Sequence, residues 1–195
     1  MRNTKKTKKH KQNTFKNENY KSSNGMLTTV WGPSLWHYLH TMSFNYPVNP
    51  TNKEKKYYKD FIINLKNVLP CKYCRINLTK NFKINPLEDK CMKNRTTFSK
   101  YIYNLHELIN KNLGKKSNLT YDEVKDRYEN FRASCNKDNK LFDFTTEKGC
   151  TNPLYGKKAK CVIKIVPQET KCKTLEIDKK CIKKRLNLKT LKIKK

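Results

Sequence analysis

The chain has 195 residues, which suits one domain of ordinary size with tails, and its formal net charge is +29. It contains no run of about 18 apolar residues, and its first 25 residues lack an apolar stretch, so we expect neither a membrane-spanning helix nor a secretory signal. Most of the positive charge comes from Lys, whereas proteins that read base edges rely on Arg. We therefore expect nucleic acid to be only an incidental partner, bound through the basic charge.

In chain order, three segments differ in composition. Residues 1–25 are rich in Lys and Asn and predict a disordered basic tail. Residues 26–135 contain both tryptophans and most of the other aromatic residues, so we expect the folded domain there. Residues 136–195, called the C-terminal segment below, are again rich in Lys. This segment contains four cysteines: Cys150, Cys161, Cys172 and Cys181.

The first two helices are predicted from their start and stop signals. The first begins at Gly32-Pro33, because Pro suits the first helical position, and a second Pro ends it at residue 47. The second begins after Thr51, where Glu54 three residues later completes a capping box, and Pro70 stops it.

Three more helices follow. One is predicted over residues 71–82 and the next over residues 97–113, with Gly114 as its C-terminal cap. A short fifth helix begins after Thr120, with Glu123 completing a second capping box. The apolar side chains predicted to face inward from the fourth helix are Phe98, Ile102, Leu105, Ile109 and Leu113.

These elements predict an all-α fold, a four-helix bundle with a short fifth helix. No strand is predicted before the apolar stretch at residues 161–167.

A Cys-x-x-Cys motif, Cys71 and Cys74, directly follows Pro70. A zinc site of this type needs a second ligand pair at short range. The other cysteines are widely spaced, and we expect His37 and His40 to face different directions on their helix, so no metal site is predicted. A redox dithiol needs only two cysteines that can close a small disulfide, one of them readily ionised, and a helix N-terminus favours the thiolate. The helical surroundings do not suit a thioredoxin fold.

Four stretches occur in a specific order: "WGPSLWHYLH", "YP", "LPCKYCRINL" and "LHELINKNLG". Together they resemble the Erv/ALR family of FAD-linked sulfhydryl oxidases, over residues 30–132. The resemblance implies a four-helix bundle with a short fifth helix, FAD in the mouth of the bundle, and a homodimer. It also implies that protein thiols reduce the disulfide at Cys71, that Cys74 lies nearer the flavin, and that oxygen accepts the electrons to give hydrogen peroxide.

The same resemblance implies a set of cofactor-binding residues. Trp36 and His40 look like the family's tryptophan-and-histidine element, and Gly32 would allow close approach of the backbone. His106 and Asn110 look like its His-x-x-x-Asn element. Each pair lies one helical turn apart, so both members can face one ligand.

Three further residues complete this set. Lys111 and Lys115 are placed to meet the pyrophosphate, and Tyr128 stands where relatives commonly have a tryptophan beside the cofactor. Taken singly, a tryptophan at helical spacing is more often a core residue, and lysines on a helix are more often solvated charges. The ordered motifs favour the cofactor interpretation for Trp36 and His106 and leave both interpretations open for the lysines.

The sequence departs from the family in its cysteines. Many cellular members carry a structural disulfide at positions that here look like Tyr103 and Thr120, and Cys91 with Cys135 could replace it. A second Cys-x-x-Cys on a flexible arm is absent as well. Either two cysteines of the C-terminal segment shuttle electrons to the core dithiol, or substrates reach Cys71 directly.

The composition, rich in Lys and Asn, resembles that of proteins from large DNA viruses. We therefore expect the protein in the viral factory of the host cytoplasm and in the virion. The alternative is a basic helical binding module with a structural Cys-x-x-Cys that contacts nucleic acid or virion components. Bound flavin distinguishes the two hypotheses.

Overall fold

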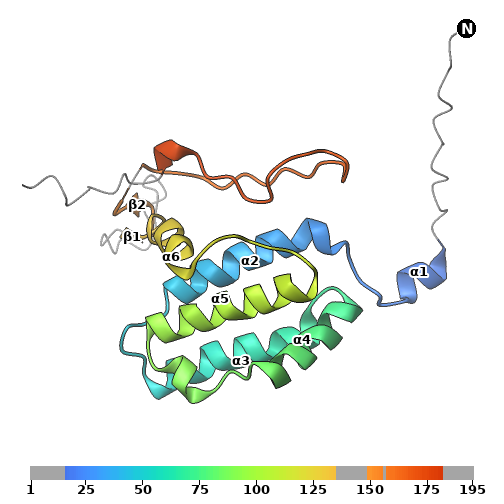
Figure 1. Ribbon diagram of the computed structural model, residues 1–195, viewed down its shortest axis with the longest axis horizontal. Coiled ribbons are helices and arrows are strands. Elements are labelled where there is room, and N and C mark those ends of the chain that lie inside the picture. Colours follow the sequence, from blue (N-terminus) through green and yellow to red (C-terminus); the bar gives the residue numbers. More distant parts are fainter. Residues whose placement is uncertain (1–15, 135–148, 156, 182–195) are drawn as a thin grey trace, which may run out of the picture.

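Figure 1 shows the computed structural model, which describes residues 16–134, 149–155 and 157–181. Among them, α2 packs on α5, α3 on α4, and α4 on α5, so these four helices form a bundle, and α6 packs on α2 at its side. The predicted all-α fold, a four-helix bundle with a short extra helix, is confirmed. The bounds are α2 (Thr28–Phe44), α3 (Asn52–Val68), α4 (Lys72–Ile84), α5 (Arg95–Asn112) and α6 (Tyr121–Glu129).

The predicted capping boxes are present at the starts of α3 and α6. In each, the threonine side chain accepts from the backbone N–H three residues on, and the glutamate there accepts from the threonine N–H. The start of α5 was predicted two residues late, because a further box formed by Asn94 and Thr97 begins it. Its predicted cap, Gly114, has a φ of +66°. Leu113 does not face inward: it follows the last helical residue and is 58% exposed.

The first bundle helix is longer than its sequence predicted. Pro33 lies inside α2, which begins at Thr28. Pro has no N–H to donate to a carbonyl four residues earlier, so this position lacks one helical hydrogen bond. A hydrogen bond to a residue before the helix stabilises this added first turn: Trp31 Nε1 donates to the carbonyl of Met26 at 3.1 Å.

The core lies between the four bundle helices and the 3-10 helix η1 (Asp89–Met92). Fully buried side chains at its centre include Tyr46, Ile62, Phe98 and Ile102. Complete burial of such side chains stabilises the fold by roughly 1.5–3 kcal/mol each. A second cluster, Phe44, Val124 and Tyr128, fixes α6 against the end of α2.

The connection from α5 to α6 is made without a disulfide. The Tyr103 hydroxyl donates to the carbonyl of Leu119 at 2.7 Å, and its ring meets Tyr121 edge-on with the centroids 5.8 Å apart. Thr120, the other position considered for a clamp, caps α6 instead. Cys91 is a free thiol, so it does not form the considered replacement bridge, and Cys135 lies outside the described residues.

The ends of the described chain differ from expectation. A disordered tail was predicted for residues 1–25. Residues 1–15 lie outside the described residues, but α1 (Asn17–Lys21) is helical and Gly25 forms a β-bridge with Cys71. Local helical hydrogen bonds and pairing with the motif order this part of a sequence that is polar throughout.

The described part of the C-terminal segment has little regular structure. The prediction that no strand precedes residue 161 was wrong, because two short antiparallel strands, β1 (Ala133–Ser134) and β2 (Asn152–Pro153), join this segment to the end of the domain. The 3-10 helix η2 (Lys179–Cys181) is a single turn. The apolar stretch at residues 161–167 forms no strand, because no partner strand pairs with it in the described chain. Within the described ranges, no helix combines the length and apolar character needed to cross a bilayer.

Candidate functional site

The Cys-x-x-Cys motif forms the N-terminus of α4. Cys71 is the N-cap residue and Cys74 lies in the first turn, with the two joined in a disulfide whose Cα atoms are 5.1 Å apart. The backbone N–H of Cys74 donates to Cys71 Sγ at 3.2 Å. Unpaired N–H groups and the helix dipole favour negative charge at this position. This geometry is the one predicted for a redox dithiol.

Residues 23–27, called the strap below, lie against the motif. Met26 N–H donates to Pro70 O at 2.7 Å, and Lys72 N–H donates to Asn24 O at 2.9 Å. Gly25 pairs with Cys71 between these bonds, at a φ of +124°. A Cβ on Gly25 would lie 2.4 Å from Pro70 O, so a side chain there would force the strap away from the motif.

Two side chains connect the strap and α2 to the motif. Arg75 donates from Nη1 to Leu69 O at 2.6 Å and from Nη2 to Ser23 O at 3.5 Å. Thr28 Oγ1 lies 3.8 Å from Cys74 Sγ. Sequence analysis missed Gly25, Thr28 and Arg75 in these roles, because their partners come from distant parts of the chain.

A ring cluster lies between α2, α5 and α6. Trp36 stacks on His106 with the centroids 3.9 Å apart and the planes 5° apart. His40 Nε2 lies 3.0 Å from His106 Nδ1, and the His40 ring is 5.2 Å from that of Tyr128. The structure thus brings together four of the residues predicted to bind a cofactor: Trp36, His40, His106 and Tyr128.

Both histidines in this cluster are neutral at pH 7. Burial lowers the pKa of His40 to about 3, with smaller contributions from His106 and His37. Burial also lowers the pKa of His106 to about 4; the charge of Glu107 opposes this shift, and that of Lys115 adds to it. One ring nitrogen of each histidine serves the bond between them, whereas the buried Nδ1 of His40 has no hydrogen-bond partner. An unpaired buried polar atom is costly, and a bound ligand would satisfy it.

His37 belongs to the same neighbourhood, although it was expected to face away from His40. Its Nδ1 lies 3.4 Å from the Tyr128 hydroxyl, and its ring is 5.6 Å from that of Tyr128. Residues three apart on a helix share a face, so the i, i+3 spacing of the two histidines was a usable signal. Burial raises the pKa of Tyr128 to about 12, so its hydroxyl keeps its proton.

The remaining predicted residues lie around the cluster. Lys111 and Lys115 are exposed and line a pocket of about 610 Å³ together with Glu107. Asn110 donates from Nδ2 to Glu107 Oε1 at 3.1 Å, so its amide is partly engaged within the protein. Gly32 is buried one turn before Trp36, and a Cβ there would meet only Thr28 Cγ2, at 3.6 Å.

This donor set fits a flavin dinucleotide. Flat aromatic and imidazole rings suit stacking on ring systems, the unpaired His40 Nδ1 offers a hydrogen bond, and Lys111 with Lys115 supplies positive charge for phosphates. Within the described ranges, no group of three or more His, Cys, Asp or Glu side chains is arranged to hold a metal ion.

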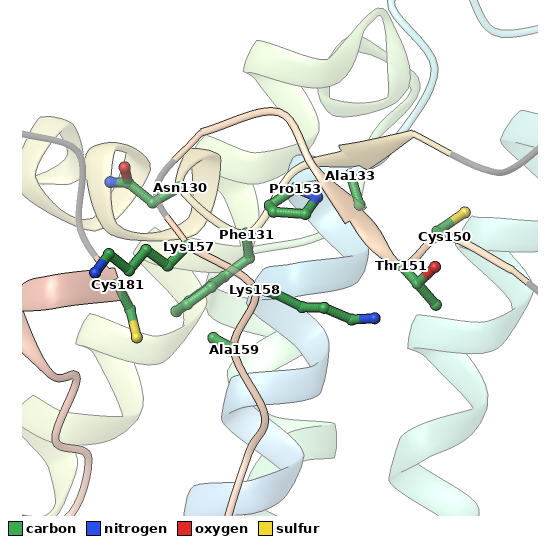
Figure 2. Close-up of a pocket in the computed structure, with 10 residues that line it drawn as sticks. All are labelled: Asn130, Phe131, Ala133, Cys150, Thr151, Pro153, Lys157, Lys158, Ala159 and Cys181. Atoms are coloured by element: carbon green, nitrogen blue, oxygen red, sulfur yellow. The ribbon is translucent and has the colours of Figure 1, made fainter. Parts of the chain in front are cut away.

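The described cysteines of the C-terminal segment are in different states. Cys161 and Cys172 are exposed free thiols and Cys181 is a partly buried one, whereas Cys150 is disulfide-bonded. Cys150 and Cys181 line a second pocket, of about 240 Å³, where Figure 2 shows their sulfur atoms on opposite sides.

The site lies within a region shared with known proteins. The model of the Erv1 / Alr family matches residues 33–129. A probable FAD-linked sulfhydryl oxidase of Acanthamoeba polyphaga mimivirus is 35% identical over 99 residues, which are 51% of this chain and 68% of that protein. A FAD-linked sulfhydryl oxidase of African swine fever virus is 32% identical over 51% of this chain and 80% of its own length.

Two further matches are more distant. A FAD-linked sulfhydryl oxidase of Arabidopsis thaliana is 28% identical over 49% of this chain, and the match spans about half of that longer relative (48%). The crystal structure of the yeast Erv1 core is 20% identical, with a TM-score of 0.46 over 63% of this chain and 92% of that structure.

Proposed function

This chain belongs to the Erv1/Alr family, and from this premise we propose that it is a FAD-dependent thiol oxidase that forms disulfide bonds in protein substrates. The net reaction is dithiol plus oxygen to disulfide plus hydrogen peroxide. The observation that carries the proposal is the Cys71–Cys74 disulfide at the N-terminus of α4, in the same bundle as the ring cluster. The basic binding module is not favoured, because the relatives are named as oxidases.

The cysteines act by thiol–disulfide exchange. A substrate thiolate attacks Cys71 Sγ, the S–S bond breaks, and Cys74 leaves as a thiolate. A second substrate thiolate attacks the substrate sulfur of the mixed disulfide, so that the substrate disulfide forms and Cys71 is released as a thiolate. The position of Cys74 supports its role as the flavin-proximal cysteine, since Cys74 and Trp36 both pack against the bundle core.

The ring cluster and its surroundings bind the cofactor in this proposal. These residues would hold FAD, which when bound would supply the two-electron chemistry that connects a dithiol to oxygen. Trp36, His106, His40 and Tyr128 provide flat surfaces and the unpaired His40 nitrogen. The further cofactor residues are Gly32, which leaves space at the backbone, Asn110, Lys111 and Lys115.

Homodimer formation is a second part of the proposal. Tyr38 on α2 and Phe61 on α3 are 54% and 40% exposed, and their rings meet edge-on with the centroids 6.1 Å apart. An exposed aromatic pair that bridges two helices suits a self-complementary contact. We place the dimer interface on this face.

The domain boundaries and location complete the proposal. The oxidase domain covers residues 26–135, together with the strap that holds its motif. Because relatives from two large DNA viruses cover most of the domain, we propose that the protein acts in the host cytoplasm, at the viral factory, and is carried in the virion.

Flavin binding is the direct test of the cofactor site. The purified protein is expected to show flavin absorbance, and heat should release FAD in about a 1:1 ratio to protein. Trp36→Ala and His106→Ala should lose most of the FAD, whereas Tyr57→Ala, which removes an exposed aromatic ring on α3, should retain it. A folded, colourless protein that takes up no added FAD contradicts the proposal.

A further inference from the structure

Thr28 is placed to act on the sulfur that leaves during disulfide exchange. We propose that the Thr28 hydroxyl is a positioning group that donates a hydrogen bond to Cys74 Sγ and stabilises the Cys74 thiolate. The proposal rests on the thiol-oxidase function and adds a residue to it. Thr28 precedes the family match, which begins at residue 33.

The contact has a defined direction. Thr28 Oγ1 and Cys74 Sγ lie 3.8 Å apart, within the range of hydrogen bonds to sulfur. A disulfide sulfur carries no hydrogen, so the hydroxyl is the donor in the oxidised protein. When a substrate thiolate attacks Cys71, the electron pair of the broken S–S bond stays on Cys74, and the same hydroxyl faces the new negative charge. A hydrogen bond to the charged form lowers the pKa of the thiol.

Two helix N-termini meet at the disulfide. Cys71 caps α4 and accepts from the Cys74 N–H, while Thr28 is the first residue of α2. Both cysteines therefore lie at the N-terminus of α4, and Cys74 Sγ also contacts the first residue of α2; both helix ends favour thiolate over thiol. The hydroxyl of Thr28 at the start of α2 thus contacts Cys74 Sγ, whereas a backbone N–H of α4 donates to Cys71 Sγ.

The strap fixes Thr28 in this place. It leads directly into α2 and is bonded to the motif at Pro70 and Lys72 through backbone hydrogen bonds of 2.7 and 2.9 Å. Gly25 permits the close approach, and Arg75 holds the start of the strap. A hydroxyl that directly follows a segment anchored on both sides of Cys71 loses little freedom when it donates.

The charged groups near Cys74 stay the same when Thr28 is replaced, so a change in the pKa of Cys74 would come from loss of the hydroxyl. Neither α2 nor α4 contains an acidic residue. The titratable and charged groups on the elements at this end of the bundle include Glu18, Tyr20, Lys21, Lys66, Cys71, Lys72, Tyr73, Arg75, Glu107 and Lys111. Replacing Thr28 by an uncharged residue leaves all of them unchanged.

The test uses an isosteric pair of variants. Thr28→Val removes the hydroxyl and keeps the branched shape, and Thr28→Ser keeps the hydroxyl. In full-length protein carrying Cys71→Ser, the pH midpoint of Cys74 alkylation is measured by peptide mass spectrometry. Thr28→Val should raise this midpoint by about half to one unit, and Thr28→Ser should leave it unchanged.

A second readout follows reduction of the Cys71–Cys74 disulfide by dithiothreitol in the variants that retain both cysteines. Because a thiol of higher pKa leaves more slowly, Thr28→Val should slow reduction about threefold, with Thr28→Ser close to the parent. Both readouts are independent of flavin and oxygen, so they hold even if the oxidase proposal fails. Equal midpoints and equal reduction rates in the Val and Ser variants would overturn the role of Thr28.

Discussion

At the residue scale, the buried histidine pair couples the candidate cofactor site to pH. The pKa values of His40 and His106 are lowered by burial to about 3 and about 4. The unfolded chain therefore binds more protons than the folded one below about pH 6.5, and folding stability must fall as the pH decreases.

We predict that the free energy of unfolding is constant above pH 7 and decreases from about pH 6.5 to 4.5. The slope approaches 1.4 kcal/mol per pH unit for each neutral histidine in this window. Urea titrations across this range measure the effect, and His106→Gln should reduce the slope by about half. Carboxyl groups with lowered pKa values, such as Glu54 and Glu129, act at lower pH and do not account for it. A flat profile between pH 6.5 and 4.5 would show that the pair is not held neutral by the fold.

The two cysteines are predicted to have separable effects. Cys71→Ser and Cys74→Ser should each abolish turnover while helical content persists, because a partly exposed pair contributes modestly to packing. The Cys74 change should alter the flavin absorbance spectrum more than the Cys71 change. Identical spectra for the two variants would contradict the flavin-proximal position of Cys74.

At the element scale, the strap requires glycine at position 25. A Cβ at Gly25 would overlap Pro70 O and would also strain a φ of +124°. Gly25→Ala should therefore destabilise the protein by about 2–4 kcal/mol and displace the strap. Gly114→Ala is the matched control: its φ of +66° is also unfavourable, but nothing lies within 4 Å, so about 1 kcal/mol is expected. Equal melting temperatures for the two variants would show that contact with the motif adds nothing.

Local signals in the sequence account for most of the bundle but not for the elements that depend on distant contacts. Capping boxes and the helix-stopping prolines depend on neighbours within a few residues, so α3 and α6 were predictable. The extra turn of α2 before Pro33 was not, because it contacts the motif, and Thr28 and Cys74 are 46 residues apart in the sequence. Residues 161–167 also depend on distant contacts. They form no strand, because apolar residues make a strand only where a partner strand pairs with them.

The candidate site shows the same division. The pairs Trp36 with His40 and His106 with Asn110 are readable as one-turn spacings, and the ordered motifs connect them to one cofactor. The stack of Trp36 on His106 and the approach of His37 to Tyr128 are tertiary contacts between α2, α5 and α6. No spacing in the sequence specifies them.

At the scale of the whole molecule, the C-terminal segment is the part with the least assigned role. Its described free thiols, Cys161, Cys172 and Cys181, are available for exchange with a substrate, whereas Cys150 is held in a disulfide. Two interpretations are distinguishable: an electron shuttle, or a structural segment outside the electron path.

Deleting residues 136–195 separates these interpretations. A shuttle predicts that turnover of a protein dithiol falls tenfold or more, about 1.4 kcal/mol of barrier, while turnover of dithiothreitol is unchanged. Both substrates are compared at matched flavin content. Unchanged turnover of both would remove the shuttle interpretation.

The central claim is that a dithiol passes electrons through Cys71 and Cys74 to bound FAD and then to oxygen. Oxygen consumption by the purified full-length protein in the presence of dithiothreitol tests it most directly. We predict steady uptake with one hydrogen peroxide formed per oxygen consumed, and loss of this uptake in Cys74→Ser at equal flavin content. A flavin-loaded, folded protein that consumes no oxygen, or a Cys74→Ser variant as active as the parent, would contradict the claim.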